Sequence, residues 1–220
     1  MVEVTDEKFR ELHARERQQA RKWARAFEQA ARDGDVDRLV GAANLLSEAT
    51  VDGWRLAMKR VARLSTASDE IRAAFANIWI ESKMLPLRVG DRRTLANDLR
   101  VLMPSGRYQG EPLTLYRGAG AGERCRRLYG FSWTRDAAIA EGFAEHWRTM
   151  QGRYPGAVLL RAIADQDAVL LFRDDDGYYA EHEVVVDPFK LRKISIVRRL
   201  FPDGESRNAT RNQTRDALEG

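Results

Sequence analysis

Two glutamates separated by one residue, Glu181 and Glu183, lie in a segment that reads as a β-strand, Tyr179–Asp187. Successive side chains of a strand point to opposite faces, so the two carboxylates share one face while His182 and Val184 point into the core. Neighbouring carboxylates repel each other, and partial burial strengthens the repulsion. Such a pair is typical of a site that performs chemistry or binds a cation. The spacing therefore favours an enzyme, with Glu183 and Glu181 as candidate catalytic residues.

A second candidate motif, Arg117-Gly118, ends a strand-like run that begins at Leu113. Alternation places Arg117 on the same face as Leu115, where a covered guanidinium needs an anionic partner. Its planar fork suits a phosphate or a carboxylate, and Gly118 would allow a ligand to approach the backbone closely. An ion pair with a carboxylate of the protein explains this motif equally well.

A third candidate motif is Ser132-Trp133-Thr134, preceded by Phe131. Ser132 and Thr134 share one face of the expected strand, and the two aromatic residues anchor the other face in the core. The hydroxyls are then available to orient a carboxylate or a ligand. Two ordinary strand hydroxyls would give the same pattern.

The order of these motifs resembles that of the mono-ADP-ribosyltransferase family, in the subgroup with an Arg, a Ser-Thr-Ser-like and a Glu-x-Glu motif. This subgroup includes many bacterial toxins. The resemblance covers about residues 113–187, with an Ala-rich helix after the serine motif as in the family. The chain departs from the family at Trp133, where a small residue is usual, and at Thr134, which replaces the last serine.

The resemblance implies a transferase that moves ADP-ribose from NAD to a macromolecular acceptor. Glu183 would be the catalytic carboxylate that stabilises the positive charge on the ribose as nicotinamide leaves. Glu181 would orient and help deprotonate the acceptor, which favours an arginine side chain. Ser132 would hydrogen-bond Glu183 and fix its rotamer.

The resemblance also implies a set of NAD-binding residues. Arg117 would bind the NAD phosphates, and Gly118 would offer its backbone to the nicotinamide amide. Tyr116, Thr134 and the segment 173–180 with Tyr178 and Tyr179 would shape the cofactor and acceptor sites. No metal is expected, because the single Cys125 and three scattered histidines offer no ligand cluster.

Several alternatives remain open at this point. Water could replace the acceptor, which would make the chain an NAD glycohydrolase. The acceptor could be a protein or, given local basic clusters, a nucleic acid, and an inhibitor or antitoxin protein could be a further partner. A reading of another class is a non-enzymatic interaction module whose helices in residues 5–64 bind a partner.

The composition is that of a globular protein rather than a membrane-spanning or disordered one. Of the 220 residues, 44% are hydrophobic and 32% charged, and no apolar run approaches the roughly 20 residues of a membrane span. The charged N-terminus has no secretory signal pattern, and one cysteine excludes an internal disulfide. The expected location is therefore the cytoplasm, or the cytoplasm of a target cell after delivery. The net charge of +4 is spread along the chain, unlike the concentrated patch of a nucleic-acid binder.

The apolar spacing predicts an α+β protein. Residues 1–103 form a helical N-terminal portion, packed on an ADP-ribosyltransferase-like β core of two largely antiparallel sheets in residues 104–202, and residues 203–220 form a polar flexible tail. Ser68 and Asp91 are candidate helix N-caps, and Pro86 is expected to end a helix. A helix from Asp136 to about Arg148 should bury a face that includes Phe143 and Trp147. The expected strands are Leu113–Arg117, Phe131–Thr134, Ala157–Ile163, Ala168–Phe172, Ala180–Val186 and Ile194–Phe201.

Overall fold

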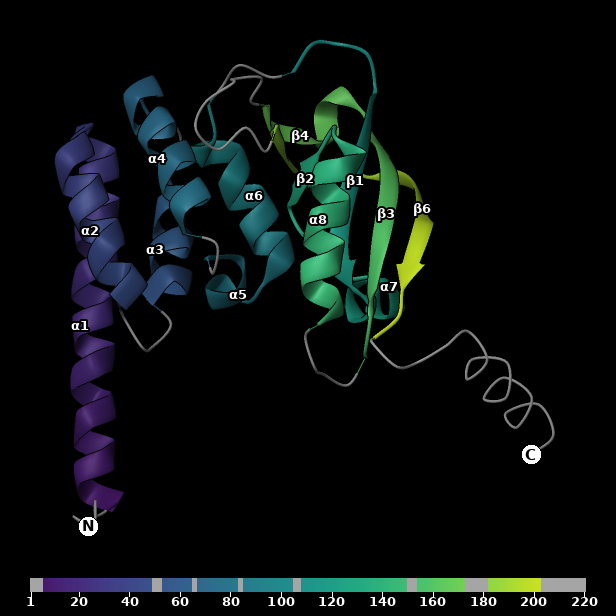
Figure 1. The fold of residues 1–220 in the computed structure, drawn as a ribbon. Coiled ribbons are helices and arrows are strands. Elements are labelled where there is room, and N and C mark those ends of the chain that lie inside the picture. Colours follow the sequence, from purple (N-terminus) through teal and green to yellow (C-terminus); the bar gives the residue numbers. More distant parts are fainter. Residues whose placement is uncertain are drawn as a thin grey trace. The chain divides into compact units, whose positions relative to one another are not determined.

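The computed structural model describes residues 6–48, 53–64, 67–82, 85–104, 108–149, 154–172 and 182–202. The chain divides into two compact units, Met1–Gly106 and Arg107–Gly220. The first unit contains helices and the second contains the sheet (Figure 1). The α+β class predicted from the sequence is therefore confirmed. In the described part of the chain, no helix has the length and apolar character needed to cross a bilayer.

Six helices make up the described part of the first unit. They are α1 (Asp6–Asp33), α2 (Val36–Glu48), α3 (Gly53–Val61), α4 (Asp69–Glu81), α5 (Leu85–Val89) and α6 (Arg92–Leu102). Phe27, Trp54 and Phe75 are fully buried and pack edge to face, with ring centroids 5.5 Å (Phe27–Trp54) and 6.5 Å (Phe27–Phe75) apart. Such aromatic contacts add to the apolar area that holds the helices together.

The helix ends follow the predicted caps at two places and differ at a third. Ser68 Oγ accepts a hydrogen bond from the backbone N–H of Ile71, and Asp91 accepts from the N–H groups of Arg93 and Thr94. The prediction that Pro86 ends a helix is wrong. Helix α4 ends earlier, and Pro86 is the second residue of α5. A proline is tolerated there because the first N–H groups of a helix have no intrahelical acceptor.

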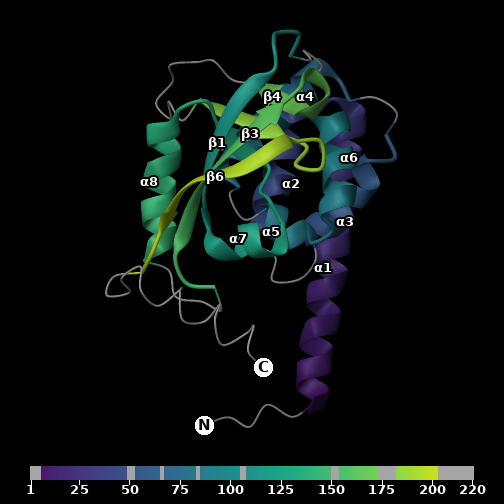
Figure 2. The same ribbon diagram turned by 90° about the vertical axis from the view of Figure 1, so that its right-hand side faces the viewer.

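The described strands of the second unit form one six-stranded sheet, where two sheets were expected. Its strands are β1 (Leu113–Gly120), β2 (Ser132–Thr134), β3 (Ala157–Ala164), β4 (Val169–Phe172), β5 (Glu183–Val186) and β6 (Arg192–Leu200). Their order across the sheet is β4-β5-β2-β1-β3-β6, and every neighbouring pair is antiparallel. Figure 2 shows β6 beside β3, and β6 is the edge strand of the sheet on that side. A single register pair, Tyr116 opposite Thr134, links β1 to β2 and joins all six strands into one sheet.

The two faces of this sheet are packed differently. One face carries the apolar cluster in which Leu115, Trp133, Leu160, Val184 and Val186 are buried. Trp133 and Val184 lie on this face, as the alternation predicted, and Val185 on the other face of β5 is buried as well.

The other face is covered in part by α8 (Ala137–Arg148), which lies along β1 (Figure 1). Ala140 and Ala144 of α8 are buried, whereas Phe143 and Trp147, which were expected to be buried, are each 40% exposed. Small residues thus make the close contact of α8 with the sheet. A short helix that the sequence analysis missed, α7 (Ala121–Arg126), follows β1, and the one-turn 3₁₀ helix η1 (Gln166–Ala168) precedes β4.

Candidate active site

The three motif strands are neighbours in the sheet, and three of their side chains form one row. Tyr116 on β1 lies opposite Thr134 on β2, which in turn lies opposite Glu183 on β5. Residues directly opposite in antiparallel strands share a face, with Cβ atoms about 4.5–5.5 Å apart. Ser132, two residues before Thr134, is on the same face. The sheet therefore brings Tyr116, Ser132, Thr134 and Glu183 together from segments far apart in the sequence.

These four side chains differ in accessibility. Tyr116, Ser132 and Glu183 are half-buried and can meet a ligand, whereas Thr134 is 5% exposed. The Thr134 hydroxyl accepts a hydrogen bond from the backbone N–H of Asp136 at 3.1 Å. Asp136 in turn caps α8 by accepting from Ala138 and Ile139. The Thr134 hydroxyl thus supports the start of the helix, and its predicted contact with NAD remains a prediction.

The predicted hydrogen bond between Ser132 and Glu183 is not formed in the described part of the chain. Ser132 lies opposite Val185, so it is a diagonal neighbour of Glu183 in the ladder. Diagonal neighbours are about 7–8 Å apart at Cα, which a long side chain such as glutamate can span. The ladder therefore leaves the Glu183 carboxylate within reach of the Ser132 hydroxyl through a change of rotamer.

Gly118 is buried against α8 rather than facing a ligand. A Cβ atom built on Gly118 would lie 2.1 Å from the carbonyl oxygen of Ala140 and 2.3 Å from the backbone nitrogen of Ala144. The close approach that glycine allows is therefore made by the helix backbone. The face of Gly118 is therefore closed by α8, and the contact of its backbone with nicotinamide remains a prediction.

Arg117 is engaged by groups of the protein itself. Its Nε and Nη2 atoms donate to the two carboxylate oxygens of Glu123 on α7, at 3.0 and 2.7 Å. Its Nη1 donates to the backbone carbonyl of Ser132 at 2.8 Å. Both side chains of the pair are 19% exposed. This is the structural ion pair that the sequence left open as an alternative, and phosphate binding by Arg117 remains a prediction.

Arg117 is also on the opposite face from the glutamate row. It follows Tyr116 along β1, and Leu115 and Ala119, its neighbours two residues away on the same face, belong to the apolar cluster. Its guanidinium reaches β2 from that side through the Ser132 carbonyl. An NAD phosphate bound to Arg117 would therefore approach from the face opposite to Tyr116 and Glu183.

The sequence analysis did not identify Glu123 and Gly130. The Gly130 N–H donates to Glu123 at 3.1 Å, and a Cβ on Gly130 would lie 2.3 Å from the Arg117 guanidinium carbon. Glu123 lies on α7 next to Arg124 and close to Arg126, and α7 has no apolar periodicity over its six residues. The one usable signal was a glycine before the serine motif.

Some predicted site residues lie outside the described part of the chain. Glu181, the segment 173–180, Tyr178 and Tyr179 are among them. His182 is described and is half-buried, with φ of +44°, and its Nδ1 is buried without a hydrogen-bond partner among the described residues. Within the described ranges, Nδ1 thus lacks the hydrogen bond that a buried imidazole nitrogen normally makes. The positive φ breaks the strand alternation, so that β5 begins at Glu183.

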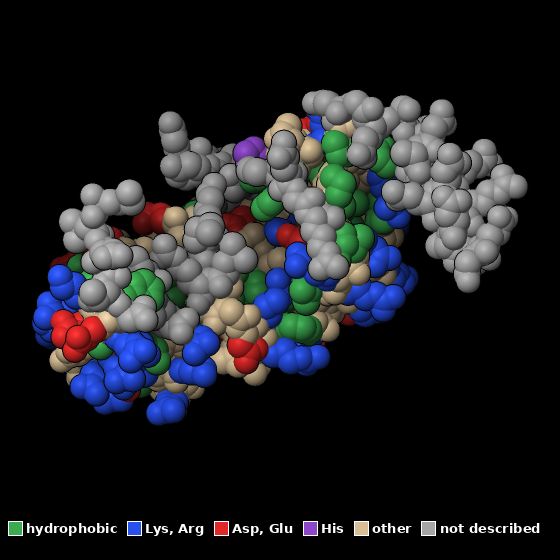
Figure 3. Space-filling model, turned by 90° about the horizontal axis from the view of Figure 1, so that it is seen from below, with side chains coloured by type: hydrophobic (Ala, Val, Ile, Leu, Met, Phe, Trp, Pro, Cys, Tyr) green, Lys and Arg blue, Asp and Glu red, His purple; other side chains and the backbone are tan. Residues whose placement is uncertain are grey.

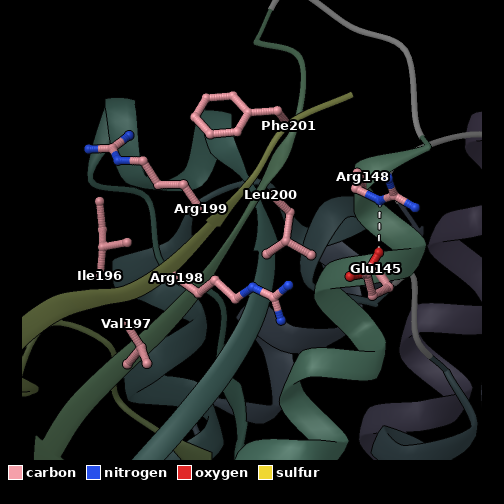
Figure 4. Close-up of a pocket in the computed structure, with 8 residues that line it drawn as sticks. All are labelled: Glu145, Arg148, Ile196, Val197, Arg198, Arg199, Leu200 and Phe201. Carbon is pink, nitrogen blue, oxygen red and sulfur yellow. Dashed lines mark ion pairs between the residues drawn. The ribbon is translucent and has the colours of Figure 1, made fainter. Parts of the chain in front are cut away.

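An open pocket of about 840 Å³ lies elsewhere, between the end of α8 and β6 (Figure 4). Arg148, Arg198 and Arg199 line it, and Glu145 pairs with Arg148 at 2.7 Å. No residue of the predicted site lines this pocket. On the face seen in Figure 3, basic side chains are interspersed with acidic and hydrophobic ones. Within the described ranges, no group of three or more His, Cys, Asp or Glu residues is arranged to hold a metal ion.

Comparison with known proteins identified no relative of this chain. Neither the family models, nor the curated proteins, nor the solved structures gave a match to this chain. The functional conclusion therefore depends on the residues and their arrangement alone.

Proposed function

We propose that this protein is a mono-ADP-ribosyltransferase that transfers ADP-ribose from NAD to a macromolecular acceptor. One observation carries the proposal: Arg117, the Ser-x-Thr motif and Glu183 lie on the adjacent strands β1, β2 and β5, with Tyr116, Thr134 and Glu183 in one row. In the chain, 13 residues separate Gly118 from Ser132, and 46 residues separate Thr134 from Glu181. For the resemblance to hold, these segments, which are distant in the sequence, therefore had to lie on neighbouring strands.

The proposal includes a division of the β core into two parts. Strands β4, β5 and β2 would form one part and β1, β3 and β6 the other, since β1 and β2 share one register pair among the described residues. If β1 and β2 diverge beyond the Tyr116–Thr134 pair, the space between the two parts would hold the dinucleotide. This is the two-sheet arrangement of the resembled family.

The chemistry assigned to the row follows from its residue types. The bond from the nicotinamide nitrogen to the ribose breaks, and positive charge develops on the ribose as an oxocarbenium-like species. The Glu183 carboxylate stabilises this charge, and the Ser132 hydroxyl donates to Glu183 when the substrate is bound. The Tyr116 ring borders the same space. Glu181 is assigned the orientation of the acceptor, with an arginine side chain favoured, and release of its proton.

The biological setting remains part of the same proposal. A bacterial or phage toxin or modifying enzyme fits the resembled subgroup, with an inhibitor protein as a possible further partner. A protein is the favoured acceptor and a nucleic acid the alternative. Distinguishing them requires identification of the modified molecule.

The experiment that tests the proposal uses NAD labelled in its adenosine half. The protein is incubated with labelled NAD, with and without a cell extract, and adducts are located by mass spectrometry. A transferase gives adducts of ADP-ribose on a macromolecule, whereas release of ADP-ribose at full rate without extract indicates a glycohydrolase. Absence of NAD consumption in both samples would contradict the proposal and favour the interaction-module alternative.

A further inference from the structure

Glu123 sits at the centre of a hydrogen-bonded clamp between β1 and β2. Its carboxylate accepts two hydrogen bonds from Arg117 on β1, at 3.0 and 2.7 Å, and one from the Gly130 N–H, at 3.1 Å. Arg117 in turn donates to the carbonyl of Ser132, the first residue of β2, at 2.8 Å. We call Glu123, Arg117, Gly130 and Ser132 the Glu123 clamp.

The clamp lies where the backbone ladder between the two strands is shortest. Strands β1 and β3 are paired along their whole length, and all three residues of β2 are paired with β5. Between β1 and β2, the register gives the pair Tyr116–Thr134 and does not continue to Ser132. The side-chain hydrogen bonds of the Glu123 clamp thus connect β1 and β2 where the described strands share no further register pair.

The residues of the clamp are matched to one another in shape and charge. The bidentate contact uses the fork geometry of arginine, which lysine cannot reproduce. A side chain at Gly130 would collide with the Arg117 guanidinium, because its Cβ would lie 2.3 Å from the carbon of that group. The Trp133 indole N–H donates to the Gly130 carbonyl at 2.9 Å, which ties this turn to β2 as well. Removal of one partner of such a partly buried pair leaves the other charge without compensation.

We propose that Glu123 is a positioning residue for the transfer reaction. Through Arg117 and Gly130 it holds β1, which carries Tyr116, at a fixed distance from β2 and β5, which carry Ser132 and Glu183. This inference rests on the proposed function. Arg117 acts in it as a structural link, and the two of its five N–H groups that make no bond in the clamp stay available to a ligand.

The test compares Glu123→Gln with a matched control, Glu145→Gln. Glu145 is also paired with an arginine, Arg148, at 2.7 Å, but on α8 and outside the clamp. Glutamine keeps the shape of the side chain, but it has no charge and its NH2 group would face a donor of Arg117 or Gly130, so the clamp is weakened with little change in volume. Two properties are measured: amide hydrogen exchange in the segments 114–118 and 130–134, and kcat and KM for NAD.

The expected result is faster amide exchange in both segments and a kcat about 10- to 100-fold lower for Glu123→Gln, since small misplacement of reacting groups has effects of this size. Glu145→Gln changes neither property. Glu123→Asp keeps a carboxylate that can accept from Arg117 and Gly130, so it should recover part of the exchange protection and of kcat relative to Glu123→Gln.

Two results would overturn the inference. Unchanged exchange and unchanged kcat in Glu123→Gln would show that the clamp positions nothing. A lower KM for NAD with unchanged exchange would show that Glu123 competes with the NAD phosphates for Arg117. If the wild-type protein failed to consume NAD, the proposed function would be rejected, together with the role of Glu123 in positioning residues for the reaction. The exchange data would still decide separately whether the clamp holds the strands together.

Discussion

Thr134 lies directly opposite Glu183 in the antiparallel ladder of β2 and β5, and its hydroxyl is bonded to the first turn of α8. The residue beside the proposed catalytic carboxylate therefore serves the fold, while the hydroxyl of Ser132, on the same face, makes no hydrogen bond among the described residues. This division of roles separates two motif residues that look equivalent in the sequence. It also connects the start of α8 to the position of β5.

Replacement of Thr134 by valine should destabilise the protein. The Asp136 N–H would lose its acceptor in a partly buried hydrogen bond, at a cost of about 1 kcal/mol in the free energy of unfolding. Thr134→Ser keeps the hydroxyl and should recover most of this loss. Urea denaturation followed by circular dichroism measures both variants. Equal stability of Thr134→Val and the wild type would show that the hydroxyl does not support the start of α8.

Gly118 and Gly142 provide a matched pair of glycines at β1 and α8. Gly118→Ala places a Cβ 2.1 Å from the Ala140 carbonyl oxygen, so α8 must shift, and the free energy of unfolding should fall by about 1–3 kcal/mol or more. Gly142 lies within α8 with nothing within 4 Å of an added Cβ. Gly142→Ala should therefore stabilise the protein by about 0.5–1 kcal/mol. Thermal unfolding of the two variants checks the opposite signs, and a Gly118→Ala variant as stable as the wild type would contradict the packing of α8 on β1.

The sequence predicted the strands of the second unit better than the partners of its charged residues. Leu115 lies between Thr114 and Tyr116, and Trp133 lies between Ser132 and Thr134, and this alternation indicates strands with one apolar face. The partner of Arg117 could not be predicted, since the place of Glu123 depends on α7, a helix too short to show an apolar period. Pro86 was misread because a proline suits both the stop of one helix and the first turn of the next.

Candidate site residues were predictable as a set of strands but not in their individual roles. Alternation correctly placed Ser132 and Thr134 on one face, and the register then added Tyr116 and Glu183. The contact of Gly118 with α8 and the bond of Thr134 to Asp136 depend on how the helix returns over the sheet. Such tertiary contacts have no signal in a local sequence pattern.

Asp98 should make the stability depend on pH. Its side chain is 2% exposed, and burial, with a smaller effect from the Asp91 carboxylate, raises its pKa to about 7. A raised pKa of a carboxyl group means that the folded state holds the proton more tightly than the unfolded state. The resulting stability is fully present below about pH 4 and is lost as the pH rises through 7.

The measurement for Asp98 is urea unfolding at pH 5 and pH 8. The free energy of unfolding of the wild type should fall by roughly 2–3 kcal/mol over this interval relative to Asp98→Asn, which carries no titrating group there. Asp37→Asn, a change at an exposed aspartate of α2, serves as the control and should keep the wild-type pH dependence. The same pH dependence in Asp98→Asn as in the wild type would contradict the raised pKa.

The most direct measurement is the rate of NAD cleavage by the wild type, Glu183→Gln and Glu145→Gln. Glu183 is placed in one row with Tyr116 and Thr134 on the motif strands, whereas Glu145 lies on α8 outside that row. The predicted result is cleavage by the wild type and by Glu145→Gln, with a loss of about two to four orders of magnitude in Glu183→Gln at unchanged thermal stability. Cleavage of NAD by Glu183→Gln at the rate of the wild type would contradict the central claim, and so would the absence of cleavage by the wild type.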